Sequence, residues 1–263
     1  MTASEAVFEA CRRLGVDNAV QRAYWRARIA ATGGRYRAHA AGVDATFAIA
    51  TRDEFLRATT FLGENAMLEA FIDDLDGDET VWDVGANVGL YACFAARALD
   101  DGVVVGVEPE PENAARLREN LTRNAPADRW RVADIALWDR DEPLSFTSER
   151  RGLGAGHHYV APWGDRSVLG RRGDTLVGAG YPTPEVLKID VQGAELHALR
   201  GLGDCLDDVE RIYAEIHTEK TARYGTTVAA VEEFLVDAGF DPDPLGEPEW
   251  NRSGVYHIRA GRT

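Results

Sequence analysis

The sequence predicts an α/β domain whose central sheet is mainly parallel. From about residue 79 onward, short apolar runs alternate with segments that repeat apolar residues at helical spacing. A glycine-containing turn, Gly85 to Gly89, separates the first run from the first helical segment, and Glu108 ends the second run. Strands that alternate with crossover helices lie parallel, so their carboxyl ends share one edge of the sheet. We expect a ligand site at that edge.

Residues 1–78 are predicted to form a cap of helices and a hairpin, and residues 79–263 the main domain. An amphipathic helical pattern covers 4–31, with an interruption near Gly15, and Gly33 and Gly34 end it. Short strand patterns at 35–40 and 46–51 flank a turn at Gly42 and indicate a hairpin. A further helix face precedes the first strand of the sheet and consists of Met67, Leu68, Phe71, Ile72 and Leu75.

The main domain is predicted to contain five strands and four helices in alternation, followed by a terminal hairpin. The expected strands are 81–84, 103–108, 130–136, 186–190 and 211–217, and the expected helices are 88–99, 111–123, 192–201 and 227–238. Residues 144–147 are a candidate for an extra strand, 148–171 for a long loop over the site, and 240–245 with 254–259 for the hairpin.

The glycine turn indicates a cofactor that contains adenosine. Glycine permits a tight turn and lets the backbone approach a ligand closely, and Glu108 can accept hydrogen bonds from ribose hydroxyls. Dinucleotide sites use the spacing G-x-G-x-x-G to hold a pyrophosphate, whereas Gly85 and Gly89 have three residues between them. Asp83, two residues before the turn, suits a cation instead. We therefore predict S-adenosylmethionine, which carries an ammonium and a sulfonium group.

Composition excludes several classes of partner. The net charge of −15 argues against nucleic acid and anionic membranes, which require clustered positive charge. No apolar run reaches the roughly 18 residues of a membrane span, and the polar start has no basic signal-peptide region. The three cysteines, Cys11, Cys93 and Cys205, have no spacing typical of zinc or disulfides. We expect a cytoplasmic protein, and the sequence gives no prediction of its oligomeric state.

These segments together resemble the FkbM family of S-adenosylmethionine-dependent methyltransferases, over about residues 79–259. The motifs that carry the resemblance are Asp83 to Gly89, Val107 to Pro109, Asp174 to Leu176, Leu187 to Glu195 and Glu215 to His217. The resemblance implies a Rossmann-like class I methyltransferase sheet of seven strands, one of them antiparallel, and methyl transfer usually to a hydroxyl oxygen. Gln192 departs from the family, which often has an acid there, and this puts metal binding at that position in doubt.

The resemblance also assigns roles to cofactor-binding residues. Asp83 and the turn through Gly85, Ala86, Asn87 and Gly89 would hold the amino-acid end of the cofactor. Glu108, followed by Pro109, would bind its ribose. Asp134 and Ile135 match the place where such enzymes bind adenine, Asp134 through the exocyclic amine and Ile135 against the ring. The alternative for Asp134 is an acid that caps a loop.

Methyl transfer to oxygen requires alignment of the reactants and removal of one proton. His217 ends strand 211–217 and shares a strand face with Glu215, which could raise the basicity of the ring, so His217 is the preferred base. Asp190 ends a neighbouring strand, shares a face with Lys188, and could orient the acceptor or act as the base itself. Glu195 begins the following helix, where a carboxylate is favoured with or without a function. Lys188, Glu195 and Glu215 are the candidates for contact with the acceptor substrate. Either His217 or Asp190 could also be purely structural.

We predict no metal site. His157 and His158 are adjacent, and adjacent residues on an extended segment point to opposite faces, although both histidines and Tyr159 could contact substrate. The predicted function is methylation of a hydroxyl or carboxylate on a small molecule or glycan unit. The alternatives are a nicotinamide-dependent oxidoreductase, against which the glycine spacing argues, and a non-catalytic cofactor-binding subunit, against which His217 and Asp190 argue.

Overall fold

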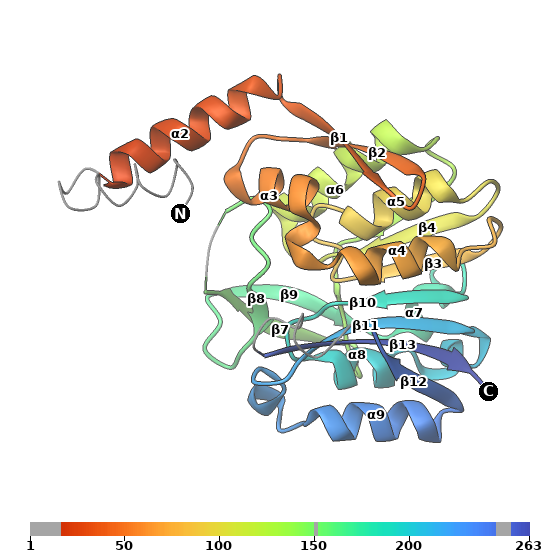
Figure 1. The fold of residues 1–263 in the computed structure, drawn as a ribbon. Helices are drawn as coiled ribbons and strands as arrows, with labels where there is room; N and C mark the ends of the chain where they lie inside the picture. Colours follow the sequence, from red (N-terminus) through yellow and green to blue (C-terminus); the bar gives the residue numbers. More distant parts are fainter. Residues whose placement is uncertain (1–16, 150–151, 246–253) are drawn as a thin grey trace.

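The computed structural model describes residues 17–149, 152–245 and 254–263 (Figure 1). A seven-stranded sheet forms the centre of the molecule, with the strand order β12-β13-β11-β10-β3-β4-β5. In that order the strands are Phe240–Pro244, Val255–Arg262, Arg211–His217, Val186–Ile189, Thr80–Val84, Val103–Val107 and Trp130–Ala133. Strand β13 is antiparallel to both of its neighbours, and β11, β10, β3, β4 and β5 pair in parallel. The prediction of seven strands with one antiparallel strand is confirmed.

Helices cover both faces of this sheet because its strands are apolar on both sides. Val81 faces one hydrophobic cluster with α4 (Asn65–Asp73), α5 (Leu90–Ala98) and α6 (Pro111–Asn124). The adjacent Trp82 faces a second cluster on the opposite side. That cluster includes residues of α7 (Gly173–Gly178), α8 (Glu195–Gly201) and α9 (Val228–Asp237). In Figure 1 α4 and α5 lie in the upper part of the molecule, and α8 and α9 lie in the lower part. The chain is thus a doubly wound α/β protein.

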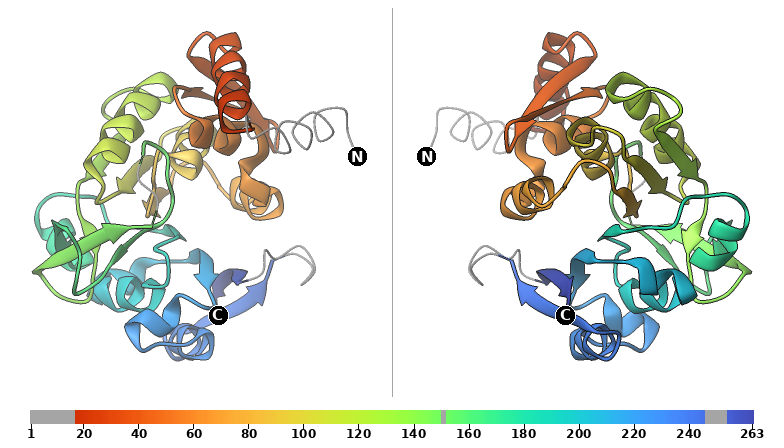
Figure 2. Two further views of the ribbon diagram at one scale, coloured as in Figure 1. Left: turned by 90° about the vertical axis from the view of Figure 1, so that its left-hand side faces the viewer. Right: turned by 90° about the vertical axis from the view of Figure 1, so that its right-hand side faces the viewer.

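The N-terminal elements pack onto the first of these clusters (Figure 2). They are α2 (Asp17–Ala31), β1 (Arg35–Ala40), β2 (Val43–Ala48), α3 (Arg52–Thr60) and the 3₁₀ turn η1 (Phe61–Gly63). The ring of Phe47 in β2 lies 5.9 Å from that of Phe94 in α5, so hairpin and sheet share one core. The first part of the helix predicted over 4–31 lies outside the described residues. The domain boundary at residue 78 stays a prediction.

The second hairpin strand was placed three residues too late at 46–51. Ala41 and Gly42 both adopt left-handed backbone angles, with φ of 45° and 76°, and this two-residue turn starts β2 at Val43. Helix α3 was not predicted, although Thr51 and Glu54 form a capping box at its start. The helix expected from the face around Met67 is α4.

A second, four-stranded sheet corrects the prediction of a long loop over 148–171. Its strands, in the order β6-β9-β7-β8, are Ala136–Leu137, Arg166–Arg171, Glu142–Ser148 and His158–Val160. The strand expected at 144–147 is confirmed as part of β7. The run 130–136 is not one strand, because the chain leaves the large sheet after Ala133 and joins the small one at Ala136. Many residues of β8 and β9 are half-buried, so apolar and polar residues do not alternate clearly along these strands. Such alternation is the sequence pattern that predicts a strand.

Two short 3₁₀ helices, η2 (Gly203–Asp208) and η3 (Thr221–Tyr224), complete the fold. Across the described parts of the chain, every helix is too short or too polar to cross a bilayer. Cys93 and Cys205 are buried free thiols, whereas Cys11 lies outside the described residues.

Candidate active site

The candidate site lies where the strand order of the large sheet reverses, between β3 and β10. Connections from neighbouring strands diverge at such a point and leave a crevice at the carboxyl ends. The turn after β3 is held by two backbone hydrogen bonds, from Gly85 N and Ala86 N to the carbonyl of Val107. Asn87 in this turn and Gln192 in the turn after β10 both have left-handed backbone angles, with φ of 53° and 58°. These are uncommon for residues other than glycine and mark both turns as specialised.

A small cavity of about 70 Å³ opens beside the glycine turn. It is lined by six of the predicted site residues, Gly85, Asn87, Glu108, Pro109, Ile135 and Asp190. Its lining also contains five aromatic residues, Trp138, Phe146, His158, Tyr159 and Tyr224. Apolar and aromatic walls with a few polar groups are typical of cofactor sites. The cavity therefore has the composition that the adenosine part of a cofactor requires.

Glu108 is the central polar group of this cavity. Its Oε2 accepts a hydrogen bond of 2.8 Å from Asn87 N, and its Oε1 accepts one of 2.8 Å from Glu110 N. Burial raises the pKa of Glu108 to about 7, although these two bonds oppose the shift. Each carboxylate oxygen has a second lone pair, so Glu108 is held in place and can still accept from two hydroxyls. These features fit a ribose ring.

Four predicted cofactor residues do not line the cavity: Asp83, Ala86, Gly89 and Asp134. The carboxylate of Asp83 is buried and accepts a hydrogen bond of 2.9 Å from Ala92 N, in the first turns of α5. Burial raises its pKa to about 6. Asp134 forms an ion pair of 2.8 Å with Arg118, and its side chain is 55% exposed. Ala86 and Gly89 shape the turn by their backbone, since Gly89 begins α5 with φ of 91°. The direct cofactor contacts proposed for Asp83 and Asp134 stay predictions.

A larger cleft of about 360 Å³ lies against the same strand ends. Three residues line both the cleft and the small cavity: Gly156, Asp190 and Gln192. The rest of its charged lining comes from α3, from the start of α4, from β11 and from the residues that follow β11. It consists of Arg52, Asp53, Arg57, Glu64, Glu215, His217, Glu219 and Lys220. The cleft is thus separated from the cavity by a shared wall that contains Asp190.

His217 lies buried at the end of β11, among carboxylates. Its Nδ1 is 3.2 Å from Glu195 Oε1, and its Nε2 is 3.3 Å from Glu215 Oε1 and 3.9 Å from Asp190 Oδ1. Burial alone would lower the pKa of His217, but the hydrogen bonds to Glu195 and Glu215 outweigh burial and raise the pKa to about 10. These distances bring His217, Asp190 and Glu215 together at the carboxyl ends of β10 and β11. At neutral pH, however, both nitrogens of the His217 ring are protonated, and the ring carries a positive charge.

Lys188 lies beneath this cluster and lines neither cavity. It is buried, and its Nζ lies 4.6 Å from the centre of the Tyr91 ring. Burial by itself lowers the pKa of Lys188, but the nearby carboxylates of Asp190 and Glu64 outweigh it and raise the pKa. Glu64 in turn accepts a hydrogen bond of 3.0 Å from the Tyr91 hydroxyl, and burial raises its pKa to about 7. Lys188 therefore balances buried negative charge below the site.

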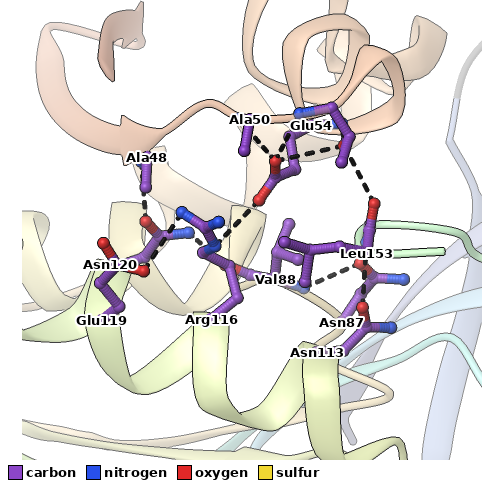
Figure 3. Close-up of polar contacts among 12 residues, drawn as sticks. Ala48, Ala50, Glu54, Asn87, Val88, Asn113, Arg116, Glu119, Asn120 and Leu153 are labelled. Atoms are coloured by element: carbon purple, nitrogen blue, oxygen red, sulfur yellow. Dashed lines mark hydrogen bonds and ion pairs between the residues drawn. The ribbon is translucent and has the colours of Figure 1, made fainter. Parts of the chain in front are cut away.

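A network of amides fixes the segment 153–156 against the glycine turn (Figure 3). Asn113 Oδ1 accepts a hydrogen bond of 3.0 Å from Gly154 N, and Asn87 Nδ2 donates one of 2.9 Å to the carbonyl of Ala155. Thr51 Oγ1 donates to the carbonyl of Leu153, which joins the segment to the start of α3. Because the segment contains Gly156, the network positions part of both the cavity and the cleft.

Sequence reasoning missed the residues that the cap and the second sheet contribute. Arg57 and Glu64 reach the cleft from α3 and from the start of α4, and no local pattern links either to the strand ends. The aromatic residues of the cavity lining include Phe146 and His158, from strands that were not recognised or were only candidates. His157 lines the cleft and His158 the cavity, which agrees with the expectation that they point to opposite sides.

Comparison with known proteins agrees with this geometry. Residues 83–242 match the Methyltransferase FkbM domain. The hexuronic acid methyltransferase AglP of Haloferax volcanii is 31% identical over 182 residues, which cover 68% of this chain and 73% of AglP. The 2-O-methyltransferase NoeI of Sinorhizobium fredii is 29% identical over 176 residues, which cover 60% of this chain and 71% of NoeI.

A solved structure shows the same fold. A candidate S-adenosylmethionine-dependent methyltransferase from Streptococcus mutans superposes with a TM-score of 0.51 at 10% identity, over 87% of this chain and 55% of that chain. The family and its relatives confirm the predicted cofactor, S-adenosylmethionine, and the predicted class of enzyme, an O-methyltransferase. The nicotinamide alternative has no support. The chain belongs to the FkbM family of methyltransferases.

Proposed function

We propose that this enzyme methylates a hydroxyl oxygen of an acidic small molecule or glycan unit. The observation that carries the proposal is the position of Asp190, which lines both the cofactor cavity and the larger cleft. S-adenosylmethionine supplies an electrophilic methyl group when it is bound. An acceptor in the cleft would meet that methyl group at the shared wall, where alignment of the reactants supplies much of the rate.

Asp190 suits the binding of the reacting hydroxyl better than His217 does. A carboxylate accepts a hydrogen bond from a hydroxyl and can take its proton. His217 was the preferred base, but its pKa of about 10 means that the ring is already protonated at neutral pH. Gln192 Nε2 donates a hydrogen bond of 2.9 Å to Asp190 Oδ1 and so holds the carboxylate in the wall. We assign His217, with Glu195 and Glu215, to the positioning of Asp190 and Gln192.

Positive groups on the cleft wall support an acidic acceptor. The buried Nε of Arg57 has no hydrogen-bond partner among the described residues. A buried donor without a partner costs free energy that a ligand carboxylate would recover. Lys220 lines the same cleft. The name of AglP, a hexuronic acid methyltransferase, supports a sugar acid as the acceptor.

The test is a methylation assay with acceptors that differ only in charge. The purified enzyme is incubated with isotopically labelled methyl donor and either a uronic acid glycoside or its carboxyl-reduced neutral form, and products are analysed by mass spectrometry. We expect ether formation on the acidic acceptor, with KM raised about tenfold or more by Arg57→Ala. Arg123→Ala is the control, since Arg123 pairs with Glu119 on the surface of α6. Equal turnover of both acceptors would exclude the acidic class.

We also propose that the acceptor is not a nucleic acid and that the protein is cytoplasmic. The net charge of −15 supports an acceptor other than nucleic acid. The two free thiols, Cys93 and Cys205, agree with a reducing compartment and hence with the cytoplasm. Fractionation of cells that produce the tagged protein, with an assay of binding to tRNA and to rRNA, tests both.

A further inference from the structure

Three side chains at the ends of β10 and β11 converge on one point in the cleft. Asp190, Glu215 and His217 each place one oxygen or nitrogen atom so that these atoms all lie within 4.8 Å of one another. His217 Nε2 is 3.3 Å from Glu215 Oε1 and 3.9 Å from Asp190 Oδ1. In metal sites these ligand types bind at about 2.0–2.2 Å, so neighbouring ligand atoms are about 3 Å apart and opposite ones about 4 Å. The observed separations need only small shifts to meet that geometry.

The cluster contains a buried acceptor that lacks a donor. Glu215 is 8% exposed, and its Oε2 has no hydrogen-bond partner among the residues that the structure describes. The Nε2 atom of His257 lies 3.6 Å from this oxygen and also has no hydrogen-bond partner in the described chain. A buried carboxylate oxygen without a partner costs about 1–3 kcal/mol or more. A cation between Glu215, Asp190 and His217 would remove that cost.

Glu195 fixes the orientation of the His217 ring through a contact with its Nδ1 atom. Its Nδ1 lies 3.2 Å from Glu195 Oε1, and Glu195 is fully buried and accepts a further hydrogen bond of 2.8 Å from Gly193 N. A carboxylate behind one ring nitrogen, with the other nitrogen facing oxygen ligands, is the usual arrangement of a metal-binding histidine. Glu195, a candidate substrate residue in the sequence, thereby has a role in the orientation of His217.

We propose that Asp190, Glu215 and His217 bind a divalent cation of the magnesium or manganese class, and that the His217 ring releases its Nε2 proton to solvent when the cation binds. This revises our prediction of no metal, and the catalytic part of the inference rests on the proposed function. Two carboxylates with one imidazole suit such cations, and the site opens into the acceptor cleft. One oxygen of Asp190 binds the cation and the other remains available to the acceptor hydroxyl. The cation favours loss of the hydroxyl proton to Asp190 or to water.

Gln192 affects the affinity of the site for the cation. Its Nε2 lies 2.9 Å from both Asp190 Oδ1 and His217 Nε2, and its Oε1 accepts a hydrogen bond from Lys220. The amide nitrogen therefore lies between two of the ligands, and the cation must displace it or meet the amide oxygen. Gln192→Glu supplies a negative oxygen in place of the amide nitrogen. We expect this variant to bind the cation at least about tenfold more tightly.

The test is titration of EDTA-treated protein with Mn²⁺, followed by electron paramagnetic resonance and calorimetry. We expect one bound Mn²⁺ per chain, at least tenfold weaker binding in Glu215→Gln and Asp190→Asn, and tighter binding in Gln192→Glu. Glu219→Gln is the matched control, because Glu219 lines the same cleft outside the cluster. Absence of Mn²⁺ binding up to millimolar concentration, or equal binding by Glu215→Gln and Glu219→Gln, would overturn the site.

Two further measurements separate this inference from the proposed function. Binding of S-adenosylmethionine and methyl transfer are both measured in EDTA and after addition of Mn²⁺. Full methyl transfer in EDTA, without Mn²⁺ binding, refutes the cation site and leaves the proposed function intact. Mn²⁺ binding without methylation of any acidic acceptor supports the site and refutes the proposed acceptor class. If Glu215→Gln does not fold, the comparison of Gln192→Glu with the unsubstituted protein decides.

Discussion

Gly85 and Asp190 belong to different turns, and their backbones are in direct contact. A Cβ atom on Gly85 would lie 1.8 Å from the carbonyl oxygen of Asp190, a distance that no side chain can adopt. Gly85 also has φ of 80°, which residues with a side chain rarely adopt. The turn that faces the cofactor and the turn that carries Asp190 are therefore fixed relative to each other by the absence of one methyl group.

Gly85→Ala is expected to be strongly destabilising, by more than about 3 kcal/mol, or to abolish cofactor binding through displacement of the Asp190 turn. Thermal unfolding and calorimetric titration with S-adenosylmethionine measure the two effects. Gly178→Ala in α7 is the control, since no heavy atom lies within 4 Å of the added Cβ. Near-normal stability together with normal affinity in Gly85→Ala would contradict the contact.

Affinity for S-adenosylmethionine is expected to rise with pH through about 7. The pKa of Glu108 is raised to about 7 by burial, and the ionised carboxylate is the better acceptor for ribose hydroxyls. In Glu108→Gln the affinity should fall about tenfold and lose this pH step. Calorimetry between pH 5.5 and 8.5 checks both statements. An unchanged pH step in Glu108→Gln would assign the step to another group.

The same raised pKa fixes the sign of the effect of Glu108 on stability. The folded protein without cofactor binds the Glu108 proton more tightly than the unfolded chain does, whose pKa is about 4.3. The contribution of this group to stability is therefore greatest at low pH and falls as the pH rises from about 4.3 to about 7. Urea unfolding of the wild type and of Glu108→Gln, compared at each pH, isolates the effect.

Asn113→Ala is expected to weaken cofactor binding more than it lowers stability. The change removes the acceptor for Gly154 N and releases the segment that lies on the glycine turn. Asn124→Ala is the matched control, because Asn124 is also buried on α6 but bonds to Thr46 in the hairpin. We expect a loss of about 1–3 kcal/mol of stability in Asn124→Ala without a change in affinity. Equal affinities in the two variants would argue against a positioning role of Asn113.

Lys188→Met should lower the free energy of unfolding by about 3–5 kcal/mol at neutral pH. It removes the positive charge that balances Glu64 and the neighbouring carboxylates below the site. The double variant Lys188→Met, Glu64→Gln should recover part of the loss, because one buried negative charge is then removed as well. Denaturant unfolding of both single variants and the double variant gives the coupling energy. Additive effects would mean that the two groups do not interact.

Much of the sheet and the cofactor side of the site could be predicted from the sequence, because the patterns that predict them involve residues close together in the chain. The Gly85 turn directly follows an apolar run, Glu108 directly ends the next, and parallel pairing then brings them together. The sequence pattern predicted the hairpin of 240–245 with 254–259, which is β12 and β13, whereas the place of one antiparallel strand in a seven-stranded sheet came from the family resemblance. Asp83 was placed correctly at a strand end, but its side chain accepts a bond from Ala92 N, which only the packing of α5 on β3 determines.

The cleft could not be predicted because it depends on contacts between distant segments. Arg57 meets Gly154, about a hundred positions later in the chain, and no spacing rule connects them. The protonated state of His217 depends on Glu195, which belongs to another strand-to-helix connection. The sequence pattern identified both residues, yet it could not show that two carboxylates would outweigh the effect of burial and turn an expected base into a cation.

The position of β13 in the sheet determines when its neighbouring strands can pair during translation. Strand β13 lies between β11 and β12, so β12 is synthesised before the only strand of the described sheet to which it pairs. During translation, strand β12 stays unpaired until residues Val255–Arg262 have left the ribosome. Glu215 and His217 likewise gain their β13 neighbours, His257 and Val255, only at that moment. The acceptor side of this enzyme is therefore among the last parts to mature, and a nascent chain arrested before residue 255 should hold cofactor contacts but no finished catalytic wall.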